Sequence, residues 1–221
     1  MKKINSEAIS NITSKEKTIS FGHQISHEWK HDAKHLCFSL SRYKFVSKMF
    51  EGLDSVLEIG AGDGFKSRIV SQTVKNLTLS DYKDINKNYN FTSDKKKQKY
   101  LVQNFIEKKL NKKYSGIYAL DVIEHISKKN EHKFITNILH SLKTKGSLIF
   151  GTPSIESQKY ASRLSNLGHI NCKNKTELKK LMLNYFNFVF AFSMNDEVLH
   201  TGFDKMSNYI FVVCCGKKSI K

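Results

Sequence analysis

Proline and arginine are scarce in this chain of 221 residues: Pro153 stands alone, and only three of the 37 basic residues are Arg. The other 34 are Lys, so the formal net charge of +17 rests on lysine. Such a charge points first to nucleic acid, but base-edge recognition relies on the Arg guanidinium, which Lys does not replace. The 17 Asn residues also fit the codon usage of an AT-rich genome. Coding bias, an anionic acceptor and RNA therefore all stay open as explanations of the charge.

Cysteine and long apolar segments are also sparse. The four Cys residues form neither a CxxC metal pattern nor a disulfide framework, which favours a reducing cytosol. The longest apolar run, 209–215, is far below the roughly 18 residues that span a bilayer. The opening MKKINSEAIS lacks the apolar segment of a signal peptide. We therefore expect a cytoplasmic location without a membrane span.

Short apolar runs alternate with helical periodicity through most of the chain. Strands are predicted at 55–60, 76–81, 100–104, 116–121, 147–151, 188–193 and 209–215. Helices are predicted at 28–50, 64–73, 128–142 and 175–185, with 83–99 as a charged surface loop. This alternation predicts the α/β class, as one domain with a largely parallel sheet covered on both faces.

The loop after the first predicted strand is rich in glycine: Glu58-Ile-Gly60-Ala61-Gly62-Asp63-Gly64. Alternating glycines let the backbone turn sharply and approach a ligand closely. The spacing fails both the G-x-G-x-x-G dinucleotide pattern and the Walker A pattern. The acids Glu58 and Asp63 would also repel a phosphate group. The loop therefore suits a ligand that carries a positive charge and no phosphate.

Asp81 ends the second predicted strand, 17 residues beyond Gly64. A carboxylate at this place can accept two hydrogen bonds from a ribose diol. A nucleoside with a cationic head and no phosphate describes S-adenosylmethionine.

Four motifs, VLEIGAGDG, LSD, ALDVIEHI and GTPS, occur in this order between residues 56 and 154. Together they resemble the motifs of class I S-adenosylmethionine-dependent methyltransferases, and the resemblance covers residues 50–215. The resemblance implies a Rossmann-like three-layer sandwich with a seven-stranded, mostly parallel sheet and a reversed last strand. Residues 51–215 would form this core and residues 1–50 a helical amino-terminal cap of the same domain. The flanking segments resemble a bacterial subgroup that modifies surface polysaccharides and small molecules.

The resemblance also implies a set of cofactor-binding residues. Asp81 would bind the ribose hydroxyls, Tyr82 would lie beside the adenine, and Asp121 would lie near the methionine amino group. Asn104 stands where an acid often contacts the adenine amine, and its side-chain carbonyl could accept the same hydrogen bond. The implied cofactor site comprises Glu58, Gly60, Ala61, Gly62, Asp81, Tyr82, Asn104, Asp121 and Val122.

Two histidines are candidates for the chemistry of the acceptor. His125 follows the fourth predicted strand, and its ordinary pKa suits proton abstraction near neutrality. His169 follows the fifth predicted strand on the same side of the sheet. Either could instead pack or cap locally, and an already anionic acceptor would need no base.

The amino-terminal segment contributes a series of histidines, His23, His27, His31 and His35, spaced by four residues. On one helix, only neighbouring members of the series could converge. A polar helix face, a basic wall for an anionic acceptor and a metal site are the alternatives, and we expect no metal. The residues expected to contact the acceptor are His23, Trp29, Arg42, Tyr43, Glu124, Tyr160 and Arg163.

The sequence thus predicts an enzyme that transfers a methyl group to an oxygen of a small molecule, a sugar, or a phosphate- or phosphoramidate-linked acceptor. An RNA methyltransferase is the second hypothesis, and a methyltransferase-like protein that binds the cofactor without turnover is the third. The acceptor and the oligomeric state, monomer or homodimer, stay open.

Overall fold

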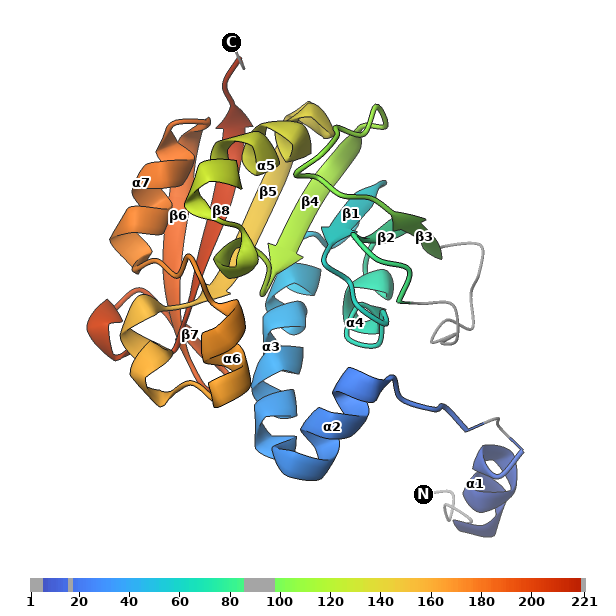
Figure 1. Ribbon diagram of the computed structural model, residues 1–221. Helices are drawn as coiled ribbons and strands as arrows, with labels where there is room; N and C mark the ends of the chain where they lie inside the picture. Colours follow the sequence, from blue (N-terminus) through green and yellow to red (C-terminus); the bar gives the residue numbers. More distant parts are fainter. Residues whose placement is uncertain (1–5, 16–17, 86–97, 220–221) are drawn as a thin grey trace.

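The computed structural model describes residues 6–15, 18–85 and 98–219. One sheet runs through the molecule, with the strand order β3-β2-β1-β4-β5-β8-β6-β7 (Figure 1). Its strands are β1 Val56–Ile59, β2 Leu77–Asp81, β3 Gln98–Val102, β4 Tyr114–Leu120, β5 Leu142–Pro153, β6 Phe186–Asn195, β7 Val198–His200 and β8 Tyr209–Lys217.

The helices lie between these strands. They are α1 Ser6–Thr13, α2 His23–His31, α3 Ala33–Met49, α4 Arg68–Ser71, α5 Lys128–His140, α6 Arg163–Gly168 and α7 Lys175–Leu183. Short 3-10 turns follow β4 as η2 Ile123–His125, β5 as η3 Ile155–Tyr160 and β7 as η4 Asp204–Met206. Among the described helices, none is both long and apolar enough to cross a membrane.

Two apolar clusters show that the sheet is the middle one of three layers. Phe134 and Ile138 of α5 and Met182 of α7 pack on one face. Val46 of α3, Phe50 just after that helix and Val70 of α4 pack on the other face. Every residue of β1 and β2 is buried, as expected for central strands covered on both sides. The predicted Rossmann-like sandwich is confirmed.

The reversed last strand is also confirmed, because β8 runs antiparallel to β5 and to β6. The sheet has eight strands rather than seven. The additional β7 folds back on β6 through a tight turn at Asp196, whose φ is +49°. Three residues are too few to produce a clear alternating pattern, so the sequence did not reveal this strand.

The helix predicted at 28–50 is two helices. Asp32, with φ −154° and ψ 67°, interrupts them, and its side chain caps α3 by accepting a hydrogen bond from the His35 amide. The helix predicted at 64–73 shortens to the single turn of α4. The predicted surface loop at 83–99 lies largely outside the described residues. The helices predicted at 128–142 and 175–185 are confirmed as α5 and α7.

Candidate active site

The order of the strands in the sheet indicates where a ligand would bind. β1 lies between β2 and β4, so the connections from β1 and from β4 diverge at neighbouring carboxyl ends. Ligands in open α/β sheets bind at such a switch point. The glycine loop follows β1 and the segment Asp121–His125 follows β4, so two distant parts of the sequence meet there.

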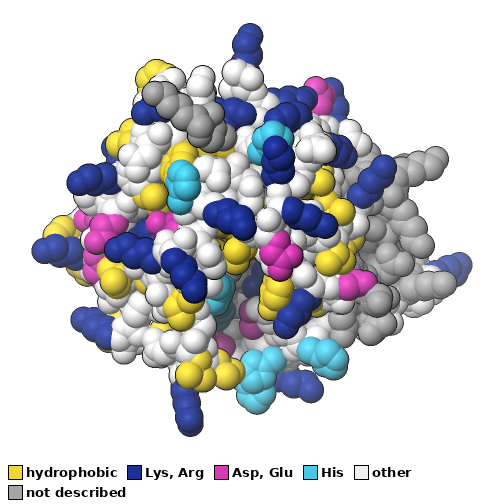
Figure 2. All heavy atoms as spheres, turned by 45° about the horizontal axis from the view of Figure 1, so that its top comes forward, with side chains coloured by type: hydrophobic (Ala, Val, Ile, Leu, Met, Phe, Trp, Pro, Cys, Tyr) yellow, Lys and Arg dark blue, Asp and Glu magenta, His cyan; other side chains and the backbone are white. Residues whose placement is uncertain are grey.

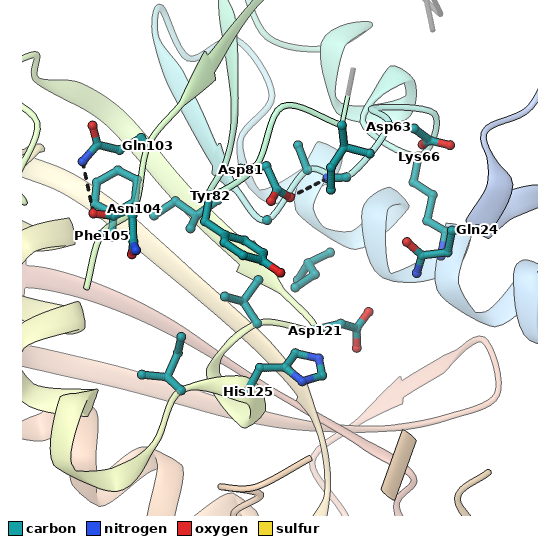
Figure 3. Close-up of a pocket in the computed structure, with 18 of the residues that line it drawn as sticks. Gln24, Asp63, Lys66, Asp81, Tyr82, Gln103, Asn104, Phe105, Asp121 and His125 are labelled. Carbon is teal, nitrogen blue, oxygen red and sulfur yellow. Dashed lines mark hydrogen bonds between the residues drawn. The ribbon is translucent and has the colours of Figure 1, made fainter. Parts of the chain in front are cut away.

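A cavity of about 560 Å³ occupies this position (Figure 3). Asp81 and Tyr82 lie on one side of it, and Asp121 and His125 lie on another. Its lining comprises Gln24, Ile25, Tyr43, Ile59–Asp63, Lys66, Asp81, Tyr82, Ile85, Gln103–Ile106, Leu120–Val122, His125, Ile126 and Phe134. The volume lies within the ordinary range of small-molecule and cofactor sites.

The glycine loop approaches the β4 segment too closely for a larger residue. Gly60 has φ +79°, and a Cβ added there would lie 2.3 Å from the Val122 Cγ2 atom. Gly62 has φ +55°, and its amide donates to the Asp81 Oδ2 atom at 3.0 Å. This hydrogen bond joins the loop to the end of β2, so the loop and the carboxylate predicted to bind ribose hold each other in place.

Glu58 lies beneath the loop rather than in the cavity, and it is buried. Tyr43 and Tyr118 donate hydroxyl hydrogen bonds to its two oxygens, at 2.9 and 2.6 Å. Burial raises the pKa of Glu58 to about 7, although the two tyrosines oppose the shift. The contact with Tyr43 links this carboxyl group to α3.

The amino-terminal helices are docked on the glycine loop. Lys66 forms an ion pair with Glu28 of α2 at 3.1 Å, and both side chains are largely buried. A Cβ added to Gly22, just before α2, would lie 2.1 Å from an oxygen of Asp63. Together these contacts place Gln24 and Ile25 in the cavity wall.

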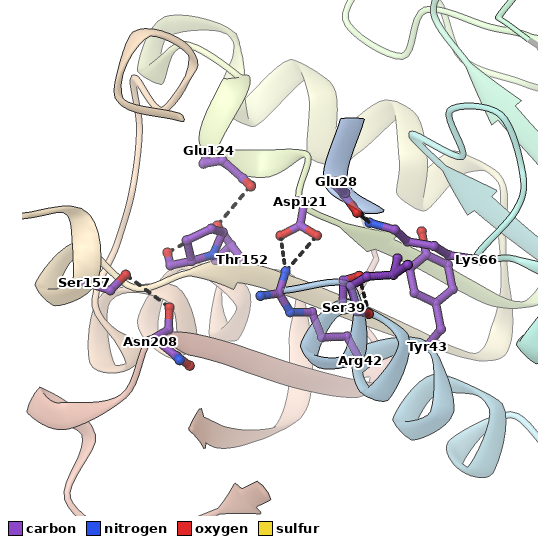
Figure 4. Close-up of polar contacts among 12 residues, drawn as sticks. Glu28, Ser39, Arg42, Tyr43, Lys66, Asp121, Glu124, Thr152, Ser157 and Asn208 are labelled. Atoms are coloured by element: carbon purple, nitrogen blue, oxygen red, sulfur yellow. Dashed lines mark hydrogen bonds and ion pairs between the residues drawn. The ribbon is translucent and has the colours of Figure 1, made fainter. Parts of the chain in front are cut away.

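Arg42 of α3 reaches the end of β4 (Figure 4). Its Nη1 atom donates to both oxygens of Asp121 at 3.1 Å, and its guanidinium stacks over the Tyr209 ring at 3.8 Å. Asp121 has φ +56°, unusual for a residue other than glycine. The ion pair holds the side chain of this residue in place at the wall of the cavity.

Glu124 and the two candidate histidines form a cluster beside the cavity. The His125 and His169 rings lie 5.3 Å apart, and Glu124 is fully buried. Burial, followed by the charge of Asp121, raises the pKa of Glu124 to about 8. Burial, followed by the charge of His125, lowers the pKa of His169. His125 lines the cavity. His169 does not line it, but its ring packs against the His125 ring.

The structure brings most predicted site residues together, but not all of them. All the predicted cofactor residues except Glu58 line the cavity, as does Tyr43. The side-chain carbonyl of Asn104 accepts the Ile106 amide at 3.0 Å, so it already has one internal partner. Arg42 and Glu124 do not line the cavity; Arg42 contacts the lining residue Asp121, and Glu124 accepts a hydrogen bond from Thr152. The predicted acceptor residues that do not line the cavity also include His23, Trp29, Tyr160 and Arg163.

Several lining residues were missed by sequence reasoning. Gln24 and Lys66 reach the cavity because the amino-terminal segment folds back onto the glycine loop. Gln103 precedes the predicted Asn104, and its side chain donates to the Lys108 carbonyl at 2.8 Å. In the sequence, only their position next to a strand end or on the cap pointed to these residues. Neighbouring residues share that position, so it could not single them out.

A family model described as a methyltransferase domain matches residues 22–189. The chain belongs to this methyltransferase family. The match spans helices α2 and α3, the glycine loop and the cluster at Glu124, so the residues that form the cavity lie within it. The class I resemblance seen in the sequence is confirmed.

Solved structures agree with the methyltransferase fold. The N-methyltransferase NodS from Bradyrhizobium japonicum WM9 superposes with a TM-score of 0.61 at 13% identity, over 85% of this chain and 99% of that one. The methyltransferase domain of bacterial CtHen1 gives a TM-score of 0.64 at 14% identity, over 80% and 98%. The plantazolicin methyltransferase BpumL gives 0.62 at 13%, over 87% and 88%.

Complexes of such relatives contain the expected cofactor or its product. NodS and BpumL have been solved with S-adenosylhomocysteine, and DhpI with S-adenosylmethionine. These complexes and the family match support S-adenosylmethionine as the cofactor. No curated protein matches the chain.

Proposed function

We propose that this methyltransferase transfers the methyl group of S-adenosylmethionine to an oxygen of a small acceptor held beside His125. The observation that supports this most strongly is the continuity of the cavity. It runs from the glycine loop and Asp81, which suit a nucleoside, to Asp121 and His125 on the far side. Donor and acceptor would therefore meet within one cavity. The whole chain would act as one domain, with residues 1–50 as its cap.

The residues present fit the donor. Gly60 leaves room where a Cβ would collide with Val122, and Asp81 offers carboxylate oxygens at the end of β2. Tyr82 would lie beside the adenine, and Asp121 would attract the cationic methionine end. When bound, the sulfonium supplies an activated methyl group. The task of the protein is then to position the groups and exclude water.

The acceptor would lie on the side of His125 and His169. A hydroxyl must lose its proton during transfer, and an imidazole in contact with the cavity is suited to assist that loss. This is the reason for proposing an oxygen acceptor. A sugar or a phosphate-linked group in surface-polysaccharide synthesis, within the cytoplasm, is the proposed setting, which rests on the resemblance of the flanking segments.

RNA is the second candidate acceptor because of the net charge of +17. Figure 2 shows Lys and Arg side chains dispersed over the visible face, with acidic and histidine side chains near its central hollow. Dispersed lysines favour general solubility over a defined track for a nucleic acid. Gel shifts at moderate salt distinguish the two acceptors, because non-specific lysine contacts weaken steeply with salt.

Calorimetry with S-adenosylmethionine tests the donor site directly. Asp81→Ala should abolish measurable binding, whereas Asp54→Ala, at an exposed ion pair with Lys75, should bind as the parent does. Absence of binding to the unmodified chain would exclude the proposed function. Transfer of a labelled methyl group to sugar nucleotides but not to RNA supports the proposed acceptor. Donor binding without transfer to either would favour the non-catalytic alternative.

A further inference from the structure

The cluster beside the cavity brings three metal-ligating groups together. One ligand atom from each of Glu124, His125 and His169 lies within 4.8 Å of the other two. Within the described part of the chain, no other trio of His, Cys, Asp or Glu side chains converges in this way. His125 borders the cavity, so whatever the cluster binds can reach the acceptor side.

Hydrogen bonds determine which nitrogen of each ring is free. The His125 Nδ1 atom lies 2.8 Å from the Gly168 carbonyl oxygen, and the His169 Nδ1 atom lies 2.7 Å from the Gln158 Oε1 atom. Gln158 donates through Nε2 to the Ser154 carbonyl, so its oxygen faces the ring. A carbonyl oxygen only accepts, so both rings must carry their proton on Nδ1. The Nε2 lone pairs are left free, as in metal-binding histidines whose other nitrogen is oriented by a carbonyl group.

Glu124 completes the set with a carboxylate oxygen. Its side chain is 0% exposed, and its Oε2 atom accepts the Thr152 hydroxyl at 3.0 Å (Figure 4). The Oε1 atom is buried and has no hydrogen-bond partner. Buried carboxylate oxygens normally have a partner, because leaving one without any costs free energy. No Lys or Arg of the described residues forms an ion pair with this side chain.

We propose that Glu124, His125 and His169 bind one divalent transition-metal ion through the carboxylate and the two Nε2 atoms. Two imidazoles and one carboxylate are a donor set that suits Zn²⁺, Fe²⁺, Co²⁺ or Mn²⁺ better than Ca²⁺. Three ligands leave coordination positions open for an acceptor oxygen or water. This inference departs from the expectation of no metal, which rested on the His23–His35 series and on the spacing of the cysteines.

The catalytic part of the inference rests on the proposed function, whereas the cation site itself does not. An acceptor hydroxyl bound to the cation is more acidic, and its proton is released to solvent. The oxygen then forms a bond to the methyl carbon as the C–S bond of the sulfonium breaks. The electron pair of that bond goes to sulfur, which leaves as a neutral thioether. His125 would thus act on the acceptor through the cation rather than as a free base.

Cobalt is a suitable probe because its visible absorption reports the coordination sphere. The full-length chain, stripped with a chelator and dialysed, is titrated with Co²⁺ alone. We expect one bound ion and new visible bands. Glu124→Gln and His169→Gln should each weaken Co²⁺ binding by more than about 100-fold. Gln158→Leu, which removes the acceptor of the His169 ring together with the hydrogen bond to the Ser154 carbonyl, should weaken it by about 10- to 100-fold.

The double variant His27→Gln/His31→Gln is the matched control, because it removes a neighbouring histidine pair on α2 whose rings lie 4.4 Å apart. It should bind Co²⁺ as the parent does. Unchanged binding in both Glu124→Gln and His169→Gln, no uptake by the parent, or loss only in the α2 variant would each overturn the proposal. Circular dichroism confirms that each variant is folded.

Donor binding in the same preparations separates this proposal from the proposed function. Uptake of Co²⁺ as expected, without binding of S-adenosylhomocysteine, would reject the proposed function and keep the cation site. Binding of S-adenosylhomocysteine without Co²⁺ uptake would reject the cation site and keep the proposed function. With both present, a chelator should abolish methyl transfer and Co²⁺ or Mn²⁺ should restore it. Full transfer in the chelator would refute the catalytic part.

Discussion

Arg42 and Asp121 lie 79 positions apart in the sequence, yet one guanidinium nitrogen donates to both oxygens of the carboxylate at 3.1 Å. This pair connects the cap helix α3 to the end of β4, beside the cavity. The Arg side chain is largely buried and the Asp side chain is half-buried, with 10% and 36% exposed. The cap is therefore held at the site by a specific ionic contact as well as by apolar packing.

Replacing Arg42 by Met should destabilise the fold, because the Asp121 charge would lose its partner in a partly buried place. We expect a loss of about 2 kcal/mol in the free energy of unfolding, below the figure for a wholly buried pair because solvent screens Asp121. Urea denaturation at neutral pH measures it. Arg163→Met, at an exposed position on α6, is the control and should leave the midpoint unchanged. Equal midpoints for Arg42→Met and the parent would show that the pair contributes nothing.

Gly60 and Gly52 offer a comparison at nearly the same backbone conformation, with φ +79° and +80°. Gly52→Ala should lose roughly 1 kcal/mol of stability, because a Cβ is unfavourable in the left-handed region, and Gly60→Ala should lose more. Only at Gly60 would the new Cβ collide with Val122, since nothing lies within 4 Å of the one at Gly52. Calorimetry should therefore show donor binding lost in Gly60→Ala and retained in Gly52→Ala. Equal donor affinity in both would contradict the close approach of the loop to β4.

The Glu28–Lys66 ion pair should control how firmly α2 covers the cavity. Amide exchange over residues 23–31 should be faster in Glu28→Gln than in the parent, and added S-adenosylmethionine should slow it in both. Asp54→Asn breaks the exposed Lys75 pair and should leave this exchange unchanged. Exchange across 20–50 that does not respond to the donor would count against a cap that closes over it.

Glu58 should make stability depend on pH. Its pKa is about 7 in the folded protein and 4.5 in the unfolded chain, so the folded state binds its proton more tightly. This stabilisation is complete below pH 4.5 and is lost as the pH rises through 7, a change of about 3 kcal/mol. Glu58→Gln removes that component, so its unfolding free energy should fall less than the parent's between pH 5 and 8. Parallel curves for the two proteins would show that Glu58 does not titrate in this way.

The local patterns were strong enough to predict most elements. The strands at 56–59 (VLEI) and 77–81 (LTLSD) are short segments with several apolar residues next to glycines or an acid, and helix α5 repeats its apolar residues at helical spacing. The short β7 and the break at Asp32 were not predictable in this way. Three residues have too little periodicity, and the helical pattern continues across Asp32 until its side chain is seen to cap α3.

The sequence by itself determined the class of fold and the residues of the glycine loop, because a strand, a turn and an acid at the next strand end are local signals. Only the tertiary structure decided how distant segments combine. It paired Arg42 with Asp121, excluded Tyr160 and Arg163 from the cavity lining, and brought His169 next to His125 and Glu124. Those contacts depend on strand order and on the return of the chain after β5, and no spacing within one segment encodes them.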